Sequence, residues 1–194
     1  MKVMFDYFFA VVGLFLCLPL LLIICILIKL TSKGPVFYTQ ERIGRNGSVF
    51  TIIKFRSMTT EHGNNNTITI DGDSRITSLG RFLRKYKLDE LPELLNILKG
   101  EMSFVGPRPD LPGYADKLKG DSRKILELKP GITSRASLKY ANEEKILAKQ
   151  DNPISYNNEV IYPDKIKMNL DYYYNHNLWI DIKIIFATIF RTFY

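Results

Sequence analysis

The stretch YFFAVVGLFLCLPLLLIICILI (residues 7–28) carries no charged side chain and decides the architecture of the chain. As an α-helix rising about 1.5 Å per residue, it is just long enough to cross a hydrocarbon core of roughly 30 Å. We therefore expect this segment to enter a lipid bilayer. A cleaved signal peptide is disfavoured, because the run is long, Asp6 interrupts the basic start, and no small-residue cleavage site follows.

Pro19 lies near the middle of this run. A proline removes one backbone hydrogen bond and its ring meets the carbonyl four residues earlier, here that of Phe15, so we expect the helix to bend or break. A sharp break would return the chain to the side on which it entered, whereas a gentle kink would let it cross. Lys2, Lys29 and Lys33 flank both ends, so the positive-inside rule leaves both topologies open.

The composition changes abruptly after Gly34 and Pro35, so we divide the chain into a membrane segment, 1–33, and a globular domain, 34–194. A chain of 194 residues has room for one such domain with its own core. The domain begins with two predicted strands, VFYTQERIG and SVFTIIKFRSM, joined by the turn Arg45-Asn46-Gly47. We therefore expect a small β-hairpin after the membrane segment.

The rest of the domain is predicted to be mainly helical, which makes the fold class α+β, mostly helical. Ser78 is placed to cap LGRFLRKYK, and Asp89 to cap a second helix that ends at Lys99-Gly100. DSRKILELKP and ASLKYANEEKILAKQ predict further helices, and EHGNNNTITIDGD a polar loop. The C-terminal NLWIDIKIIFATIFRTFY is amphipathic and suits the membrane interface, although a buried helix fits nearly as well.

The charge balance favours a partner that carries phosphate. The chain holds 27 Lys and Arg against 20 Asp and Glu, a formal net charge of +7, with a pI of about 9.3. Nucleic acid, anionic lipid and a nucleotide diphosphate all satisfy this preference. Charge alone does not choose among them.

Asp89 and Glu90 form an adjacent acidic pair at the predicted start of the second helix. The free N–H groups of a helix N-terminus favour ionised carboxylates. Two adjacent anions suit a divalent cation, and Mg²⁺ takes one or two carboxylates together with phosphate oxygens. An ionised Asp is also a nucleophile toward phosphorus. Acidic residues in a first helical turn commonly do no more than interact favourably with the helix dipole. The neighbouring cations are therefore needed to distinguish this role from a catalytic one.

Several cations are candidates for binding phosphate. Pro107 and Pro109 restrict the backbone on both sides of Arg108, so its planar guanidinium would lose little entropy on binding. Lys54 and Arg56 are two residues apart on a predicted strand, which places both on one face. The complete set is Arg108, Lys54, Arg56, Arg75 and Arg42.

Three segments together carry a family resemblance, namely YTQERIGRNGSVFTIIKFRSM, DSRITSLGRFLRKYKLDELPELLNILKGEMSFVGPRPD and KPGITSRASLKY. They resemble the bacterial sugar transferases of the small monotopic phosphoglycosyl transferase superfamily, which start glycoconjugate assembly on undecaprenyl phosphate. The K-F-R-S-M, L-D-E-L-P and K-G-x-M-S-F-V-G-P-R-P blocks are specific in this order and spacing. The match runs nearly from end to end.

The resemblance implies a re-entrant N-terminal helix broken at Pro19 and a monotopic protein, with its catalytic domain on the cytoplasmic face of the inner membrane. It implies dependence on Mg²⁺ and a ping-pong reaction, in which Asp89 attacks the β-phosphate of a UDP-sugar, UMP leaves, and undecaprenyl phosphate takes the sugar phosphate. Glu90 would share the metal and Arg108 would hold phosphate. Lys54, Arg56 and Arg75 match other charged positions of the family pattern.

The implied partners are thus a UDP-sugar, undecaprenyl phosphate, membrane lipids and the glycosyltransferases that act later on the same lipid, and no nucleic acid is expected. The sugar itself is not named, and we expect specificity to lie in residues 62–66 and 111–158. Ala141 stands where some relatives carry Arg, and whether Arg135 replaces it stays open.

Two other interpretations compete with this mechanism. A membrane-anchored basic protein could bind nucleic acid or anionic lipid through KFRSM and GRFLRKYK, but it would leave L-D-E-L-P and GPRP unexplained. Alternatively, the lipid phosphate could attack directly while Asp89 only binds metal. Release of UMP from a UDP-sugar distinguishes the transferase from the binding protein. A covalent adduct on Asp89 distinguishes attack by Asp89 from direct attack by the lipid phosphate.

Overall fold

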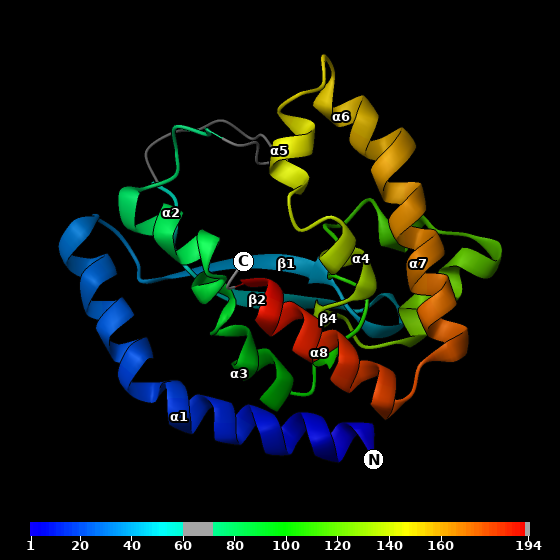
Figure 1. The fold of residues 1–194 in the computed structure, drawn as a ribbon, viewed down its shortest axis with the longest axis horizontal. Helices are drawn as coiled ribbons and strands as arrows, with labels where there is room; N and C mark the ends of the chain where they lie inside the picture. The colour runs from blue at the N-terminus through cyan, green and yellow to red at the C-terminus, as the bar shows by residue number, and fades with distance from the viewer. Residues whose placement is uncertain (60–71, 193–194) are drawn as a thin grey trace.

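The computed structural model describes residues 1–59 and 72–192 (Figure 1), so the predicted polar loop of residues 61–73 lies almost entirely outside it. The first element, α1 (Lys2–Thr31), stays helical through Pro19 and changes direction part-way along its length (Figure 1). The helix is therefore bent and not broken. Its two halves lie at an angle and both follow the surface of the domain.

Most side chains of α1 have no cover from the rest of the described chain. Only Asp6, Ala10, Ile24 and Ile28 are buried. The helix is long and apolar enough to cross a membrane, with a mean hydropathy of 3.3 over its most apolar window and 11% of that window buried. An exposed apolar surface of this extent needs lipid or another apolar partner, which indicates a membrane protein.

The predicted hairpin is confirmed. Strands β1 (Phe37–Ile43) and β2 (Val49–Phe55) pair antiparallel and are joined by the turn η1 (Arg45–Gly47). The register places Tyr38 opposite Lys54. Phe50 and Ile52 on the same face as Lys54 are buried, so this face of the hairpin is turned toward the interior.

Two helix starts differ from their prediction. In α2 (Ser78–Lys85) the cap is Thr77, whose hydroxyl accepts from the Gly80 N–H, and not Ser78. The predicted helix of residues 89–99 is in two parts, a 3₁₀ turn η2 (Leu88–Glu90) and α3 (Glu93–Leu98). Asp89 thus lies inside the turn and does not cap α3, which begins after Pro92 because proline needs no N–H partner there.

The sequence did not predict the second sheet, a parallel pair of β3 (Ser103–Val105) and β4 (Gly131–Thr133). Gly106 and Gly131 approach so closely that a Cβ on Gly131 would lie 2.1 Å from the Gly106 nitrogen. The Gly131 N–H donates to the Pro107 carbonyl at 2.9 Å. The backbones of the GPRP and KPG segments are therefore in direct contact, and only glycine permits so close an approach.

The C-terminal half is helical, in more pieces than expected. ASLKYANEEKILAKQ forms two short helices, and the long helix before the last one was not predicted. In chain order the elements are η3 (Ala115–Lys117), η4 (Gly120–Glu127), α4 (Arg135–Lys139), α5 (Glu143–Leu147), α6 (Pro153–Tyr156), η5 (Asn157–Ile161), α7 (Tyr162–Asn175) and α8 (Leu178–Thr192). The predicted C-terminal helix corresponds to α8, which exposes Trp179, Phe186 and Phe190.

Both halves of α1 contribute to the core. Near its start, Ala10 packs with residues of the hairpin and of α3, the full cluster being Ala10, Phe50, Ile52, Leu94, Ile97 and Met102. Near its end, Ile24 and Ile28 pack with Phe55 and Leu83. The membrane helix is therefore bound to the domain along its length.

Polar contacts also tie both ends of α1 to the domain. At the start, the Lys2 ammonium donates to Asp181 Oδ2 at 2.6 Å and to the Val105 carbonyl at 3.0 Å. At the end, the Arg56 guanidinium donates to the carbonyls of Ser32 and Lys33 at 2.9 and 2.6 Å. These carbonyls belong to the open C-terminus of the helix, so Arg56 caps α1.

Asp181→Asn is expected to lower the free energy of unfolding by about 2 kcal/mol, because Lys2 would lose its charged partner in a site where Asp181 is 1% exposed. For a chain of this size that lowers the Tm by about 4–8 °C, measurable by thermal unfolding in nanodiscs. The matched control is Asp171→Asn in the exposed pair with Arg135, expected to change stability by under about 0.5 kcal/mol. Equal effects of the two substitutions would contradict a structural role for the Lys2–Asp181 pair.

Candidate active site

The acidic pair lies in the short 3₁₀ turn between α2 and α3. Asp89 and Glu90 are each 7% exposed. The preceding residue, Lys87, adopts a left-handed backbone with φ of 57°. Lys87 directly follows Tyr86, the C-cap of α2, and a left-handed residue commonly ends a helix at this position. The turn that follows it holds both carboxyls inside the protein.

Two cations meet on one oxygen of Glu90. The Lys54 ammonium, from the interior face of β2, lies 2.8 Å from Glu90 Oε1. The Arg108 guanidinium, from the GPRP segment, lies 2.6 Å from the same oxygen. The structure thus brings together four of the predicted site residues, Asp89, Glu90, Lys54 and Arg108, from three segments of the chain.

The two carboxyls of the pair are held differently. Burial, and then repulsion from Glu90, raise the pKa of Asp89. Burial acts on Glu90 in the same direction, but Arg108 and Lys54 outweigh it and hold the pKa of Glu90 well below its usual range. Asp89 Oδ1 is buried without a hydrogen-bond partner among the described residues. An unpartnered carboxylate oxygen in such a position is available to a ligand or to an electrophile.

Sequence reasoning missed a third carboxyl, that of Glu93 in the first turn of α3. It is 1% exposed, and its Oε1 lies 3.0 Å from the Lys54 ammonium. Burial raises the pKa of Glu93 to about 7, against the opposing effect of Lys54. The available signal was its spacing, three residues after Glu90, which places both side chains on neighbouring positions of one helical turn.

The other predicted cations are engaged differently. Arg42 donates to the Pro109 carbonyl at 3.2 Å, so it supports the GPRP segment beside Arg108, and its Nε is buried without a partner among the described residues. Arg56 caps α1, as described above, and its two terminal nitrogens are occupied there. Arg75 pairs with Asp73 at 2.6 Å. The prediction that Arg56 faces phosphate beside Lys54 has no support from these contacts.

Two further predictions concern less central positions. Arg135 pairs with Asp171 of α7 at 2.7 Å, so its contact is on the outer side of α4 and it carries no sign of replacing the arginine missing at Ala141. The segment of residues 62–66, expected to contribute to sugar specificity, lies outside the described residues.

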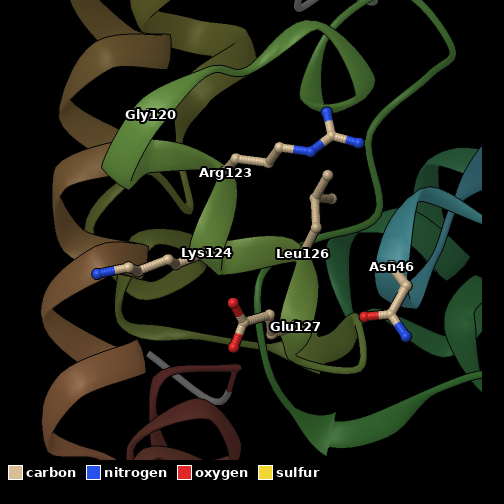
Figure 2. Close-up of a pocket in the computed structure, with 6 residues that line it drawn as sticks. All are labelled: Asn46, Gly120, Arg123, Lys124, Leu126 and Glu127. Atoms are coloured by element: carbon tan, nitrogen blue, oxygen red, sulfur yellow. The ribbon is translucent and has the colours of Figure 1, made fainter.

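A separate cavity of about 380 Å³ lies between the hairpin turn and η4 (Figure 2). Its lining residues are Asn46, Gly120, Arg123, Lys124, Leu126 and Glu127. The Lys124 side chain points toward α7, where it donates to the Tyr174 hydroxyl at 2.7 Å. None of the predicted site residues lines this cavity, so it is no part of the candidate active site, which is the acidic turn.

Comparison with known proteins shows the family of the chain. A family model described as bacterial sugar transferase matches residues 1–194. A UDP-glucose:undecaprenyl-phosphate glucose-1-phosphate transferase of Klebsiella pneumoniae is 37% identical over 185 residues, covering 93% of this chain and 37% of that protein. A UDP-N-acetylgalactosamine-undecaprenyl-phosphate N-acetylgalactosaminephosphotransferase of Aeromonas hydrophila is 36% identical over 192 residues, covering 95% and 41%.

These two relatives are longer proteins, and the chain spans about two fifths of their length. A putative undecaprenyl-phosphate N-acetylgalactosaminyl 1-phosphate transferase of Bacillus subtilis is closer in size, 39% identical over 135 residues that cover 69% of this chain and 72% of that protein. A family model that matches every residue, with relatives of these identities, shows that the chain belongs to the bacterial sugar transferase family.

Proposed function

We propose that this protein transfers a sugar 1-phosphate from a UDP-sugar to undecaprenyl phosphate and releases UMP, as the first membrane step in building a bacterial glycan. The observation that carries the proposal is the unpartnered, buried Oδ1 of Asp89 beside a carboxylate that gathers two cations. The names of the relatives, which act on UDP-sugars and undecaprenyl phosphate, support the substrate classes.

In the proposed reaction an Asp89 oxygen attacks the β-phosphorus of the UDP-sugar. The bond from that phosphorus to the bridging oxygen breaks, and UMP leaves with the bridging oxygen. An oxygen of undecaprenyl phosphate then attacks the phosphorus of the acyl phosphate, which restores the Asp89 carboxylate and yields a sugar joined to the lipid by a diphosphate. Arg108 and Lys54 would bind the phosphate oxygens whose charge the attack redistributes.

Mg²⁺ is proposed as cofactor, and the residues present fit it. The free oxygen of Asp89 and the carboxylate of Glu90 are hard oxygen donors. Within residues 1–59 and 72–192 no group of three or more potential metal ligands is gathered, so the diphosphate and water would complete the coordination. When bound, the ion would neutralise charge on the diphosphate and on the departing UMP.

The ties at both ends of α1 support a re-entrant topology. Lys2 is bound to α8 and Ser32 to Arg56, so both ends of the helix are held by one domain. A helix that crossed the bilayer would carry its ends to opposite faces, and one of the ties would break. We propose that residues 1–33 dip into the inner membrane and return, leaving 34–194 as the catalytic domain on its cytoplasmic face.

The test is release of UMP from a panel of UDP-sugars by the purified chain in nanodiscs with Mg²⁺ and undecaprenyl phosphate. Release that requires one sugar nucleotide, the metal and the lipid supports the proposal and names the sugar. No release with any sugar would refute it and favour a basic lipid- or nucleic-acid-binding protein. The glycosyltransferases that extend the product are the expected later partners.

A further inference from the structure

The buried carboxyl of Glu93 has no part in the reaction proposed above, yet it contacts Lys54, which does. The Lys54 ammonium lies between two carboxylates, 2.8 Å from Glu90 Oε1 and 3.0 Å from Glu93 Oε1. Lys54 is 13% exposed and Glu93 2% exposed at their side chains. Charged groups at such depth stay charged only when they are paired, so this pairing determines where Lys54 rests.

The two carboxylates differ in what else they bind. Glu90 Oε1 also accepts from Arg108 at 2.6 Å, so Glu90 divides its charge between two cations. Lys54 is the one ion-pair partner that Glu93 has among the described residues. Glu93 is also carried by α3, whose Leu94 and Ile97 are packed in the core. Glu93 thus pairs with Lys54 alone among the described residues, and the helix α3 that carries it is held in place by the core.

A lysine needs such a partner more than an arginine does. Its ammonium is a point charge on a flexible four-carbon stem, and a single hydrogen bond leaves the stem free to swing. Glu90 is expected to loosen its hold on Lys54 whenever a phosphate competes for the ammonium or a metal ion competes for the Glu90 oxygens. A second carboxylate on α3 keeps the ammonium in place through that exchange.

From these contacts we infer that Glu93 is a positioning residue, which holds Lys54 beside the Asp89–Glu90 turn without touching substrate itself. The inference rests on the proposed function, because it assigns Lys54 to the phosphate of the transferred group. It adds a residue whose role is to fix a cation while the substrate displaces that cation from Glu90.

Glu93→Gln, compared with the wild type above about pH 8 where the Glu93 carboxyl is ionised, tests this inference, since it keeps the shape of the side chain and removes the charge. The first readout is acetylation of Lys54 by an N-hydroxysuccinimide ester, followed by peptide mass spectrometry on the full chain in nanodiscs without substrate. We expect Lys54 to react about fivefold faster in the variant, because its ammonium has lost the charge of its ion-pair partner 3.0 Å away. The second readout is UMP release, with kcat expected to fall about tenfold and the KM of the UDP-sugar to change less.

The matched control is Glu143→Gln, which removes the partner of Lys165 at 2.6 Å outside the site. It should speed acetylation of Lys165 and leave acetylation of Lys54 as in the wild type. A merely structural role for Glu93 predicts a lower Tm with unchanged acetylation of Lys54 in the folded protein. That result would overturn the inference, and so would faster acetylation with an unchanged kcat.

If Glu93→Gln does not fold, Glu93→Asp replaces it, because the shorter side chain keeps the charge but withdraws it from Lys54. Acetylation of Lys54 at the wild-type rate in that variant would overturn the inference. Should the wild type release no UMP, the proposed function fails, while the acetylation rates still decide whether Glu93 holds Lys54. The two failures are therefore distinguishable.

Discussion

Asp89→Asn is expected to lower UMP release by at least about 10³-fold, the largest effect of any single substitution in the chain. An amide has nearly the shape of the carboxylate but is no nucleophile toward phosphorus. Asp89 Oδ1 has no hydrogen-bond partner among the described residues, so the substitution breaks no internal hydrogen bond of that atom, and the fold should persist. The measurements are UMP release in nanodiscs and the Tm of the variant.

The covalent intermediate gives the same prediction a second readout. Wild-type protein incubated with the UDP-sugar alone, without lipid acceptor, should carry a phosphosugar on the peptide that contains Asp89, and hydroxylamine should remove it. Glu90→Gln is the contrast, because it changes the neighbouring carboxyl and leaves the nucleophile present. Turnover in the wild type without an adduct would favour direct attack by the lipid phosphate, and near-normal turnover by Asp89→Asn would refute the assignment of the nucleophile.

Helices and strands marked by their composition or by a turn motif were predictable from the sequence. The short strands that pair across a long stretch of chain were not. The uncharged run of α1, the Asn-Gly turn of the hairpin and the apolar period of α8 are local signals. Strands β3 and β4 are three residues each and pair across the intervening chain, so their contact depends on the fit of Gly106 to Gly131. No pattern within either segment reports such a contact.

The helix α7 was missed for a different reason. It follows α6 and η5 without interruption, and Pro153 and Pro163 each stand at the first turn of a helical stretch. Pro153 is tolerated because its missing N–H would have no partner at the start of the helical stretch, whereas Pro163 directly follows the π-type turn in which the Tyr162 N–H donates to the Asn157 carbonyl. Read along the sequence, the same residues, with the asparagines between them, resemble loop signals.

The site was partly predictable because its four central residues come from motifs with a chemical meaning. The prediction for Arg56 found no support because strand alternation gives the face of a side chain and not its partner. The Arg56 N–H continues the pairing by donating to the Val36 carbonyl at 2.9 Å, and the guanidinium donates to the carbonyls of Ser32 and Lys33 after α1. Glu93 escaped notice because an acidic residue in a first helical turn is ordinary, and only the position of Lys54 distinguishes it.

Arg108 is the second residue for which a large effect is expected, and its surroundings explain why. Its guanidinium donates to Glu90 Oε1 at 2.6 Å, while its side chain remains 44% exposed. Prolines on both sides and the contact of Gly106 with Gly131 fix the backbone that carries it. The guanidinium is thus anchored to Glu90 on one side and open to a ligand on the other.

Arg108→Lys is therefore expected to lower kcat/KM for the UDP-sugar about 10²-fold although the charge is kept. An ammonium placed near Glu90 can donate to that carboxylate or to a phosphate, but it cannot present the planar pair of N–H groups that binds two phosphate oxygens at once. The control is Arg123→Lys in the cavity of Figure 2, expected to stay within about twofold of the wild type because no site residue lines that cavity. Equal activity of Arg108→Lys and the wild type would mean that Arg108 supplies charge alone, and the proline-restricted guanidinium would then need another explanation.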